Sequence, residues 1–233
     1  MQVIIVKNAE QGIERAKEKL YEEVDNKTVL FLSGGSTPKA LYEVLATEKI
    51  IRPAAVALVD ERFGEPLHEN SNERMIEKSG LLGYFRAQGI PVHFILKEGK
   101  TQEEVAAEYD ETVRKLFFHF HKSVGVLGIG KDGHTSSIAP NRKDFQNPMF
   151  DPKQKHLFVS QFTDTNSAYG SRIGLTFAGL SLLDNMIIIA FGKEKAKVIK
   201  KMFAQGPLEE IPARFFTGDQ VGKKTVLITN QKL

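Results

Sequence analysis

Short apolar runs alternate with longer amphipathic segments along almost the whole chain. The runs are of strand length, are apolar on both sides and are rich in Val, Ile and Leu, as in strands that are buried on both faces. Strands of this kind that are joined through helices indicate a mainly parallel sheet, so the predicted fold class is α/β. The predicted strands are Val3–Lys7, Thr28–Ser33, Val56–Asp60, Val92–Leu96, Val124–Ile129, Leu157–Gln161, Ile187–Phe191 and Thr225–Thr229.

Helices are predicted between these strands. Ile13, Ala16 and Leu20 recur at steps of three and four residues, which gives one apolar face to a helix between the first two strands. Thr101 is followed three residues later by Glu104, a capping-box pattern, so a helix should start there and run to about residue 120. Further helices are predicted at Lys39–Thr47, Ser71–Leu82 and Glu194–Gln205.

Length and composition exclude several classes of protein. The chain has 233 residues, 41% hydrophobic and 26% charged, and neither a repeat nor a linker divides it, so we expect one domain over residues 1–233. It has no cysteine, which excludes disulfides, thiolate nucleophiles and Cys-ligated metals. Its apolar runs fall well short of the ~18 residues that cross a bilayer, and its beginning lacks the pattern of a secretory signal. We therefore expect no membrane partner and a cytoplasmic location.

The charge balance bears on possible partners. The net charge is +3, and Lys and Arg are spread along the chain instead of forming a run. This mild excess favours an anionic small ligand over nucleic acid. Nothing in the sequence points to a subunit interface, so we expect a monomer or a weak homo-oligomer.

A glycine-rich turn follows the second predicted strand. Gly34 and Gly35 permit a tight turn, Ser36 and Thr37 supply hydroxyl donors, and Pro38 suits the first turn of a helix. Such a turn points backbone amides and the positive end of a helix dipole at one spot, which favours a phosphate. The alternative is an ordinary strand-to-helix turn with a Ser or Thr cap. No lysine stands where a Walker A loop requires one.

Three charged residues, Asp60-Glu61-Arg62, follow the third predicted strand. In open parallel sheets the ligand crevice lies beyond the carboxyl ends of the strands, so these side chains are well placed for binding. A salt-bridged strand end or a helix cap is an equally simple interpretation.

The segment Gly128–Ser137 follows the fifth predicted strand and contains the spacing G-x-G-x-x-G. A dinucleotide-binding interpretation is disfavoured, because Pro140 would end the following helix within two turns and the usual acidic ribose ligand would fall in the irregular stretch Pro140–Lys155. The motif also lies in mid-chain instead of opening the fold.

His134 stands beside Asp132 in this glycine-rich segment. Imidazole has an unperturbed pKa near 6.5, so His134 is a candidate general base at neutral pH. The alternative is a surface or capping histidine. His119 and His121 are two residues apart on a predicted helix and would point away from each other, so no metal site is expected there.

The motifs together resemble 6-phosphogluconolactonases over nearly the whole chain. The resemblance rests on their order: Ser33–Pro38, then Asp60-Glu61-Arg62 with Ser71-Asn72, Gly128–Ser137, Arg172–Thr176 and Gly192–Ala196. That family shares its fold with glucosamine-6-phosphate deaminases. The resemblance therefore implies a three-layer α/β/α fold with a mostly parallel central sheet.

Two segments separate the two activities. In the deaminases a phenylalanine, an asparagine and a glutamate precede the proline after the DGH motif, whereas Ser137, Ile138 and Ala139 precede Pro140 here. The deaminases have tyrosine where Arg62 stands. The sequence therefore resembles the lactonases more closely. Deaminase activity, and a sugar-phosphate-binding regulatory domain without turnover, remain as alternatives.

The resemblance implies hydrolysis of 6-phospho-D-glucono-1,5-lactone to 6-phosphogluconate, a step of the oxidative pentose phosphate pathway. His134 would act as general base on water, Asp132 would orient it, and Asp60 would be a third catalytic residue facing the sugar. A lactone is already an activated ester, so no cofactor and no metal are expected.

The resemblance also implies the binding residues for the sugar phosphate. Arg62 would face the sugar. The phosphate would be held by the turn Gly34, Gly35, Ser36 and Thr37 together with Arg172 and Lys195.

Overall fold

A computed structural model of the chain describes residues 1–163 and 170–232 and contains a large and a small β-sheet. The large sheet has seven strands in the order β1-β10-β9-β6-β2-β3-β5, and every neighbouring pair is parallel. The predicted α/β class with a mainly parallel sheet is therefore confirmed. These strands are β1 (Gln2–Ile5), β2 (Thr28–Leu32), β3 (Ala55–Leu58), β5 (Val92–His93), β6 (Lys122–Gly128), β9 (Asn185–Ala190) and β10 (Thr225–Thr229).

The small sheet is antiparallel, in the order β4-β8-β7. Its strands are β4 (Asp60–Arg62), β7 (Val159–Thr163) and β8 (Ser171–Leu175). The prediction of one strand over Val56–Asp60 is wrong in its last part, because the chain leaves the large sheet after Leu58. The amide of Val59 donates to Leu32 of β2 (2.9 Å), and its carbonyl accepts from Leu175 of β8 (2.9 Å). Asp60 therefore begins β4 at the junction of the two sheets.

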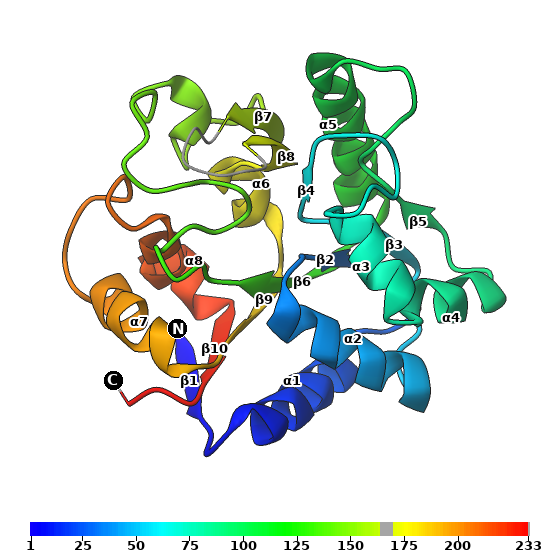
Figure 1. Cartoon of the computed structure of the whole chain (residues 1–233), viewed down its shortest axis with the longest axis horizontal. Helices are drawn as coiled ribbons and strands as arrows, with labels where there is room; N and C mark the ends of the chain where they lie inside the picture. The colour runs from blue at the N-terminus through cyan, green and yellow to red at the C-terminus, as the bar shows by residue number, and fades with distance from the viewer. Residues whose placement is uncertain (164–169, 233) are drawn as a thin grey trace.

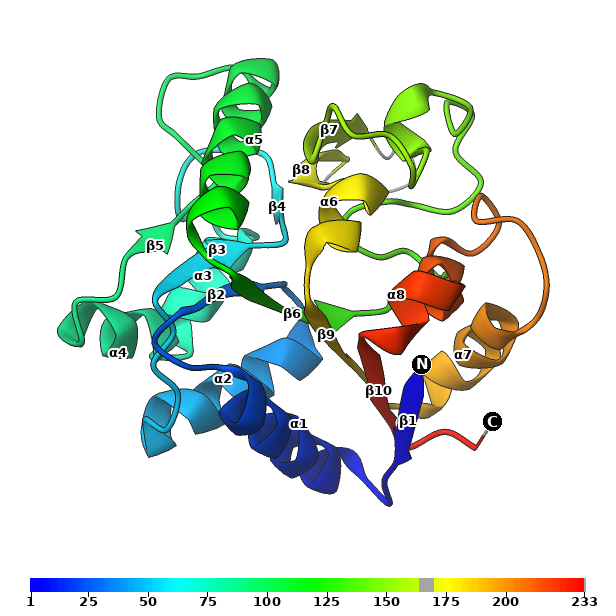
Figure 2. The same cartoon turned by 180° about the vertical axis from the view of Figure 1, so that it is seen from behind.

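Helices lie on both sides of the large sheet (Figures 1 and 2). In Figure 1, α1 and α2 lie below the sheet and α5 with the small sheet lies above it, while both chain ends lie near β1. The helices are α1 (Ala9–Glu23), α2 (Ser36–Glu48), α3 (Asn72–Lys78), α4 (Leu81–Ala87), α5 (Gln102–His119), α6 (Phe177–Leu182), α7 (Ala196–Phe203) and α8 (Asp219–Lys223), with 3-10 turns η1 (Pro148–Phe150), η2 (Lys193–Lys195) and η3 (Pro212–Thr217).

All but one of the helix predictions hold with shifted ends. The capping box of Thr101 and Glu104 is present at the start of α5, as predicted. The helix predicted at Lys39–Thr47 begins three residues earlier, at Ser36. The helix predicted at Ser71–Leu82 is two helices, because Gly80 adopts a left-handed conformation (φ +83°) between α3 and α4.

The strands at the centre of the large sheet form the core. Every residue of β2 and β3 is buried, and helices cover the sheet with aromatic side chains such as Phe85 and Phe177. Each such aromatic or branched side chain contributes about 1.5–3 kcal/mol when it leaves water. No helix in the described part of the chain has both the length and the apolar composition needed to cross a membrane.

The segment after β6 is irregular. Residues 129–147 contain turns and a single isolated bridge between Thr135 and Ile138, but no helix. A dinucleotide fold requires a helix directly after this strand, so that alternative is excluded here. The stretch predicted as irregular, Pro140–Lys155, contains only the short turn η1, and stacking of Phe145 on Phe150 (5.1 Å) anchors it.

Gly179 provides a test of this packing. A methyl group there would lie 2.2 Å from the backbone carbonyl oxygen of Phe158, whereas one at Gly83 in α4 would meet nothing within 4 Å. We expect Gly179→Ala to destabilise the fold by about 1–3 kcal/mol, because backbone must move. Gly83→Ala should instead stabilise it by up to about 1 kcal/mol through helix propensity. Urea denaturation measures the free energy of unfolding of both variants. Equal changes in the two variants would contradict the close approach of Gly179 in α6 to the backbone of Phe158.

Candidate active site

A cavity of about 320 Å³ opens at the carboxyl ends of the central strands. The loops that follow β2, β3, β6 and β9 all contribute to it, as expected for an open parallel sheet. Most of the residues predicted from the sequence line it. The lining comprises Ser33, Gly34, Gly35, Ser36, Thr37, Pro38, Asp60, Leu127, Gly128, Ile129, Gly130, Lys131, His134, Thr135, Ser136, Ile189, Glu194 and Lys195.

The N-terminus of α2 forms one wall of the cavity. Gly35 is the N-cap with φ +113°, a conformation that favours glycine, and no side chain caps the helix. Because α2 begins at Ser36, the amides of its first turn lie at the cavity wall, together with the positive end of the helix dipole. This geometry suits a bound anion.

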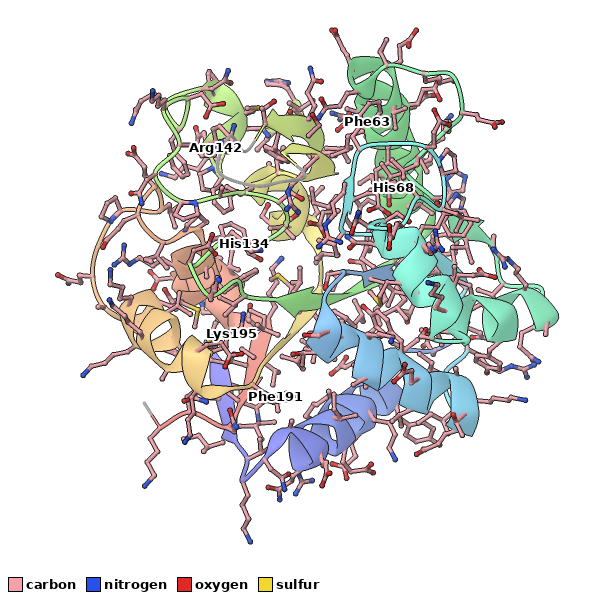
Figure 3. The ribbon with its side chains drawn as sticks, viewed as in Figure 1. Phe63, His68, His134, Arg142, Phe191 and Lys195 are labelled. Carbon is pink, nitrogen blue, oxygen red and sulfur yellow. The ribbon has the colours of Figure 1, made fainter. Side chains whose placement is uncertain are left out.

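Lys195 stands on the other side of the same cavity, in η2. Its Nζ donates to the carbonyl oxygen of Ile129 (2.7 Å). Burial lowers the pKa of Lys195, although the carboxylates of Glu194 and Asp132 act in the opposite direction. Figure 3 shows Lys195 and His134 on neighbouring segments. The cavity therefore has a cationic group opposite the open helix end.

His134 and Asp132 form a close pair. The Nδ1 atom of His134 lies 2.6 Å from Oδ1 of Asp132, and the His134 side chain is 45% exposed. Partial burial raises the pKa of Asp132, but the hydrogen bond and charge of His134 outweigh it and lower that pKa to about 2. An ionised Asp132 accepts from Nδ1–H, which leaves Nε2 of His134 as the basic nitrogen. Because the pKa of Asp132 is lowered from 3.8 to about 2, the contribution of its ionised form to stability is present above pH 3.8 and is lost as the pH falls from there toward 2.

Backbone contacts fix the position of this pair. A methyl group at Gly130 would lie 2.1 Å from Nδ1 of His134, so only glycine allows this approach. The carbonyl of His134 accepts from the amide of Gly130 (2.9 Å), and the amide of Gly133 donates to the carbonyl of Gly130 (3.0 Å). The turn therefore holds the imidazole at the cavity edge.

Asp60 is held by two side chains from other segments. Its Oδ2 accepts from the hydroxyl of Ser137 (2.6 Å), and its backbone carbonyl accepts from the side-chain amide of Asn72 (2.8 Å). Ser136 and Ser137 both adopt left-handed conformations (φ +47° and +66°), which are unfavourable for residues with a side chain. The hydroxyl of Ser136 donates to Leu175 of β8 (2.8 Å), so both strained residues bond to other segments.

Glu61 and Asn72 hold the segment of Asp60 in place through hydrogen bonds, a role that the sequence did not predict. Glu61 is fully buried and accepts from the amide of Arg62 in β4 and from the amides of Asn72 and Glu73 at the start of α3. Burial raises the pKa of Glu61 to about 7, although these three donors favour its ionised form. Asn72 also packs against Gly34, where a methyl group would lie 1.8 Å from its Oδ1. The available signal was Ser71, the N-cap of α3, whose hydroxyl accepts from the amide of Arg74 three residues later.

The lining defined by the described residues does not include Asp132, Arg62 or Arg172. Asp132 contacts His134, which does line the cavity. Arg62 of β4 pairs with Arg172 of β8, so the two arginines lie side by side on one face of the small sheet. Asp60 points to the same face, two residues or about 7 Å from Arg62 along β4. Arg172 is not among the described residues that line the cavity with the turn Gly34–Thr37 and Lys195, and its contact with a phosphate stays a prediction.

Arg62 is held beside this face. Its guanidinium donates to the carbonyl of Asn70 (2.6 Å) and lies 3.4 Å from Oδ1 of Asn72. The two arginines place positive charge next to Asp60, beyond the rim of the cavity.

The histidines near the end of α5 do not lie as predicted. The helix ends at His119, so His121 lies outside it, and the premise that both are on one helix is wrong. Residues 1–163 and 170–232 contain no group of three or more His, Cys, Asp and Glu side chains that could hold a metal ion.

Comparisons with known proteins show which sequences and structures the chain is similar to. The sequence is 30% identical over 186 residues to a 6-phosphogluconolactonase of Xylella fastidiosa, covering 79% of this chain and 75% of that protein. It is 28% identical over 229 residues to a glucosamine-6-phosphate deaminase of Ligilactobacillus salivarius, covering 91% of each.

Solved structures share the fold. A 6-phosphogluconolactonase from Shewanella baltica superposes with a TM-score of 0.82 at 21% identity, covering 100% of this chain and 98% of that one. The 6-phosphogluconolactonase of Thermotoga maritima gives a TM-score of 0.72 at 27% identity, covering 99% and 98%. The family described as glucosamine-6-phosphate isomerases/6-phosphogluconolactonase matches residues 3–227. The chain therefore belongs to this family, as its motifs predicted.

Proposed function

We propose that this protein hydrolyses 6-phospho-D-glucono-1,5-lactone to 6-phosphogluconate. The observation that carries the proposal is the 2.6 Å pair of His134 and Asp132 at the edge of a cavity that also contains an open helix N-terminus. Curated relatives from Xylella fastidiosa and other bacteria carry the name of this activity. The reaction belongs to the oxidative pentose phosphate pathway.

In the proposed reaction, Nε2 of His134 takes a proton from a water molecule as its oxygen attacks C1 of the lactone. The carbonyl oxygen becomes an oxyanion, and backbone amides of the glycine-rich loops are the candidate donors to it. When the C1–O bond to the ring opens, the imidazolium returns the proton to the ring oxygen. Asp132 stabilises the imidazolium between these two steps, and such acid–base help is worth about 10²–10⁴ in rate.

The phosphate would bind between the first turn of α2 and Lys195. Amides at Ser36 and Thr37 and the ammonium group of Lys195 can each make charge-assisted hydrogen bonds, worth about 1.5–3 kcal/mol apiece. Binding at this remote end would hold C1 near His134, so that binding energy lowers the barrier. Asp60 and the two arginines beyond it would then face the sugar.

Deamination of glucosamine 6-phosphate is the alternative to exclude. The resemblance places a glutamate at position 139 in the deaminases, but Ala139 here is buried beside the buried Ile138. The carboxyl group that would assist ring opening is therefore missing from this loop. Parallel assays with freshly generated lactone and with glucosamine 6-phosphate test the proposal. Turnover of glucosamine 6-phosphate without hydrolysis of the lactone would favour the deaminase over the lactonase.

The role of His134 can be tested by substitution. We expect His134→Ala to lower kcat at least tenfold with little change in KM, because the water loses its base while the phosphate contacts remain. His119→Ala on the surface of α5 is the control and should behave as the wild type. Steady-state assays with fresh lactone decide this, and wild-type turnover by His134→Ala would remove the imidazole from the mechanism.

Lys195 tests the phosphate end. We expect Lys195→Ala to raise KM for the phosphorylated lactone about tenfold or more, since one charge-assisted contact is lost. Hydrolysis of unphosphorylated gluconolactone should change little. Lys193→Ala, in the same turn η2 but outside the cavity lining, is the matched control. An equal loss with both lactones would show that Lys195 does not recognise phosphate.

Ser137 tests the support of Asp60. Removing the hydroxyl takes away a 2.6 Å donor to the carboxylate, so we expect Ser137→Ala to reduce kcat/KM about tenfold. Ser137→Gly should show the same loss, although glycine relieves the left-handed backbone. Ser181→Ala, whose hydroxyl bonds only within α6, serves as control. Activity retained in Ser137→Gly would assign the effect to backbone strain instead.

A further inference from the structure

Ser33 has a buried hydroxyl without a hydrogen-bond partner. The residue directly follows β2 and is 6% exposed, and its Oγ contacts no donor or acceptor in the described structure. Its backbone is fully engaged, because its amide donates to Val126 (3.2 Å) and its carbonyl accepts from the hydroxyl of Tyr42 (2.9 Å). The backbone of Ser33 is therefore fixed, while its buried hydroxyl has no partner among the described residues.

Other buried serines behave differently. The hydroxyls of Ser79, Ser123 and Ser136 all bond to protein groups at 2.6–2.8 Å. Buried polar atoms are nearly always paired, because an unpaired one keeps the cost of leaving water. An exception inside a ligand cavity points to a partner that arrives with the ligand.

Ser33 lines the cavity. Its strand, β2, runs between β3 and β6, so Ser33 lies between the start of the Gly128–Ser137 loop and Asp60. The next residues along the chain are Gly34 and Gly35, which lead into the open first turn of α2. A donor here would act beside the backbone donors of that turn.

We propose that the Ser33 hydroxyl binds an oxygen atom of the sugar phosphate. This assignment rests on the proposed lactonase function and adds to it a ligand-binding side chain that precedes the glycine-rich turn. A hydroxyl can donate to a phosphate oxygen or to a carbohydrate oxygen, and both are oxygen acceptors within one substrate.

The test compares Ser33→Ala with Ser123→Ala. Ser123 lies at the opposite end of the sheet, at the start of β6, and its hydroxyl bonds to Asp184. We measure Kd for 6-phosphogluconate by calorimetry, KM for the lactone, and Tm without ligand. In Ser33→Ala we expect the Kd for 6-phosphogluconate and the KM for the lactone each to rise about tenfold. Tm should stay unchanged or rise, because the substitution removes an unpaired buried hydroxyl. Ser123→Ala should lower Tm and leave Kd unchanged.

Inorganic phosphate is the second probe. A parallel loss of its affinity in Ser33→Ala assigns the contact to the phosphate end, and a loss confined to 6-phosphogluconate assigns it to the carbohydrate. Wild-type Kd and KM in Ser33→Ala, with or without a lower Tm, would overturn the proposal. If the wild type hydrolyses the lactone but Ser33→Ala matches it, only the Ser33 proposal fails and the proposed lactonase function stands. If the wild type neither hydrolyses the lactone nor binds 6-phosphogluconate, both proposals fail.

Discussion

Val59 joins the two sheets, and the site depends on this junction. Its amide bonds to β2 in the large sheet and its carbonyl bonds to β8 in the small one, each at 2.9 Å. The chain therefore cannot continue along the large sheet, and Asp60 turns toward the cavity instead. Without the second sheet, Asp60 would extend β3 and Ser137 would have no carboxylate to bind.

Support for the site comes from segments that are far apart in the sequence. Asp60 is fixed by Asn72 and Ser137, and Asn72 is in turn held by the buried Glu61. The left-handed residues before Ile138 cost conformational energy, which their hydrogen bonds offset. The carboxylate is consequently held in place before any ligand arrives, and such preorganisation benefits a site that stabilises developing charge.

The cavity brings together positive groups and a base. The first turn of α2 and Lys195 provide positive potential, and the His134–Asp132 pair provides a base with an ionised partner close to Lys195. A substrate that carries both a phosphate and an ester carbon fits this set of groups. Ser33, for which we propose a ligand contact, lies where the central strand ends.

The sequence by itself determined the parallel α/β class, the helix that starts at Thr101, and the gathering of Gly35, Asp60 and His134 at one sheet edge, whereas Lys195 was expected there only from the family resemblance. These follow from local periodicity, caps and turns, and from the rule that parallel strands end at a common edge. Only the tertiary structure decided the small sheet, the burial of Glu61 and the place of Arg172. These depend on pairings such as Asp60 with Gly174, which join residues more than a hundred positions apart and leave no local pattern in either segment.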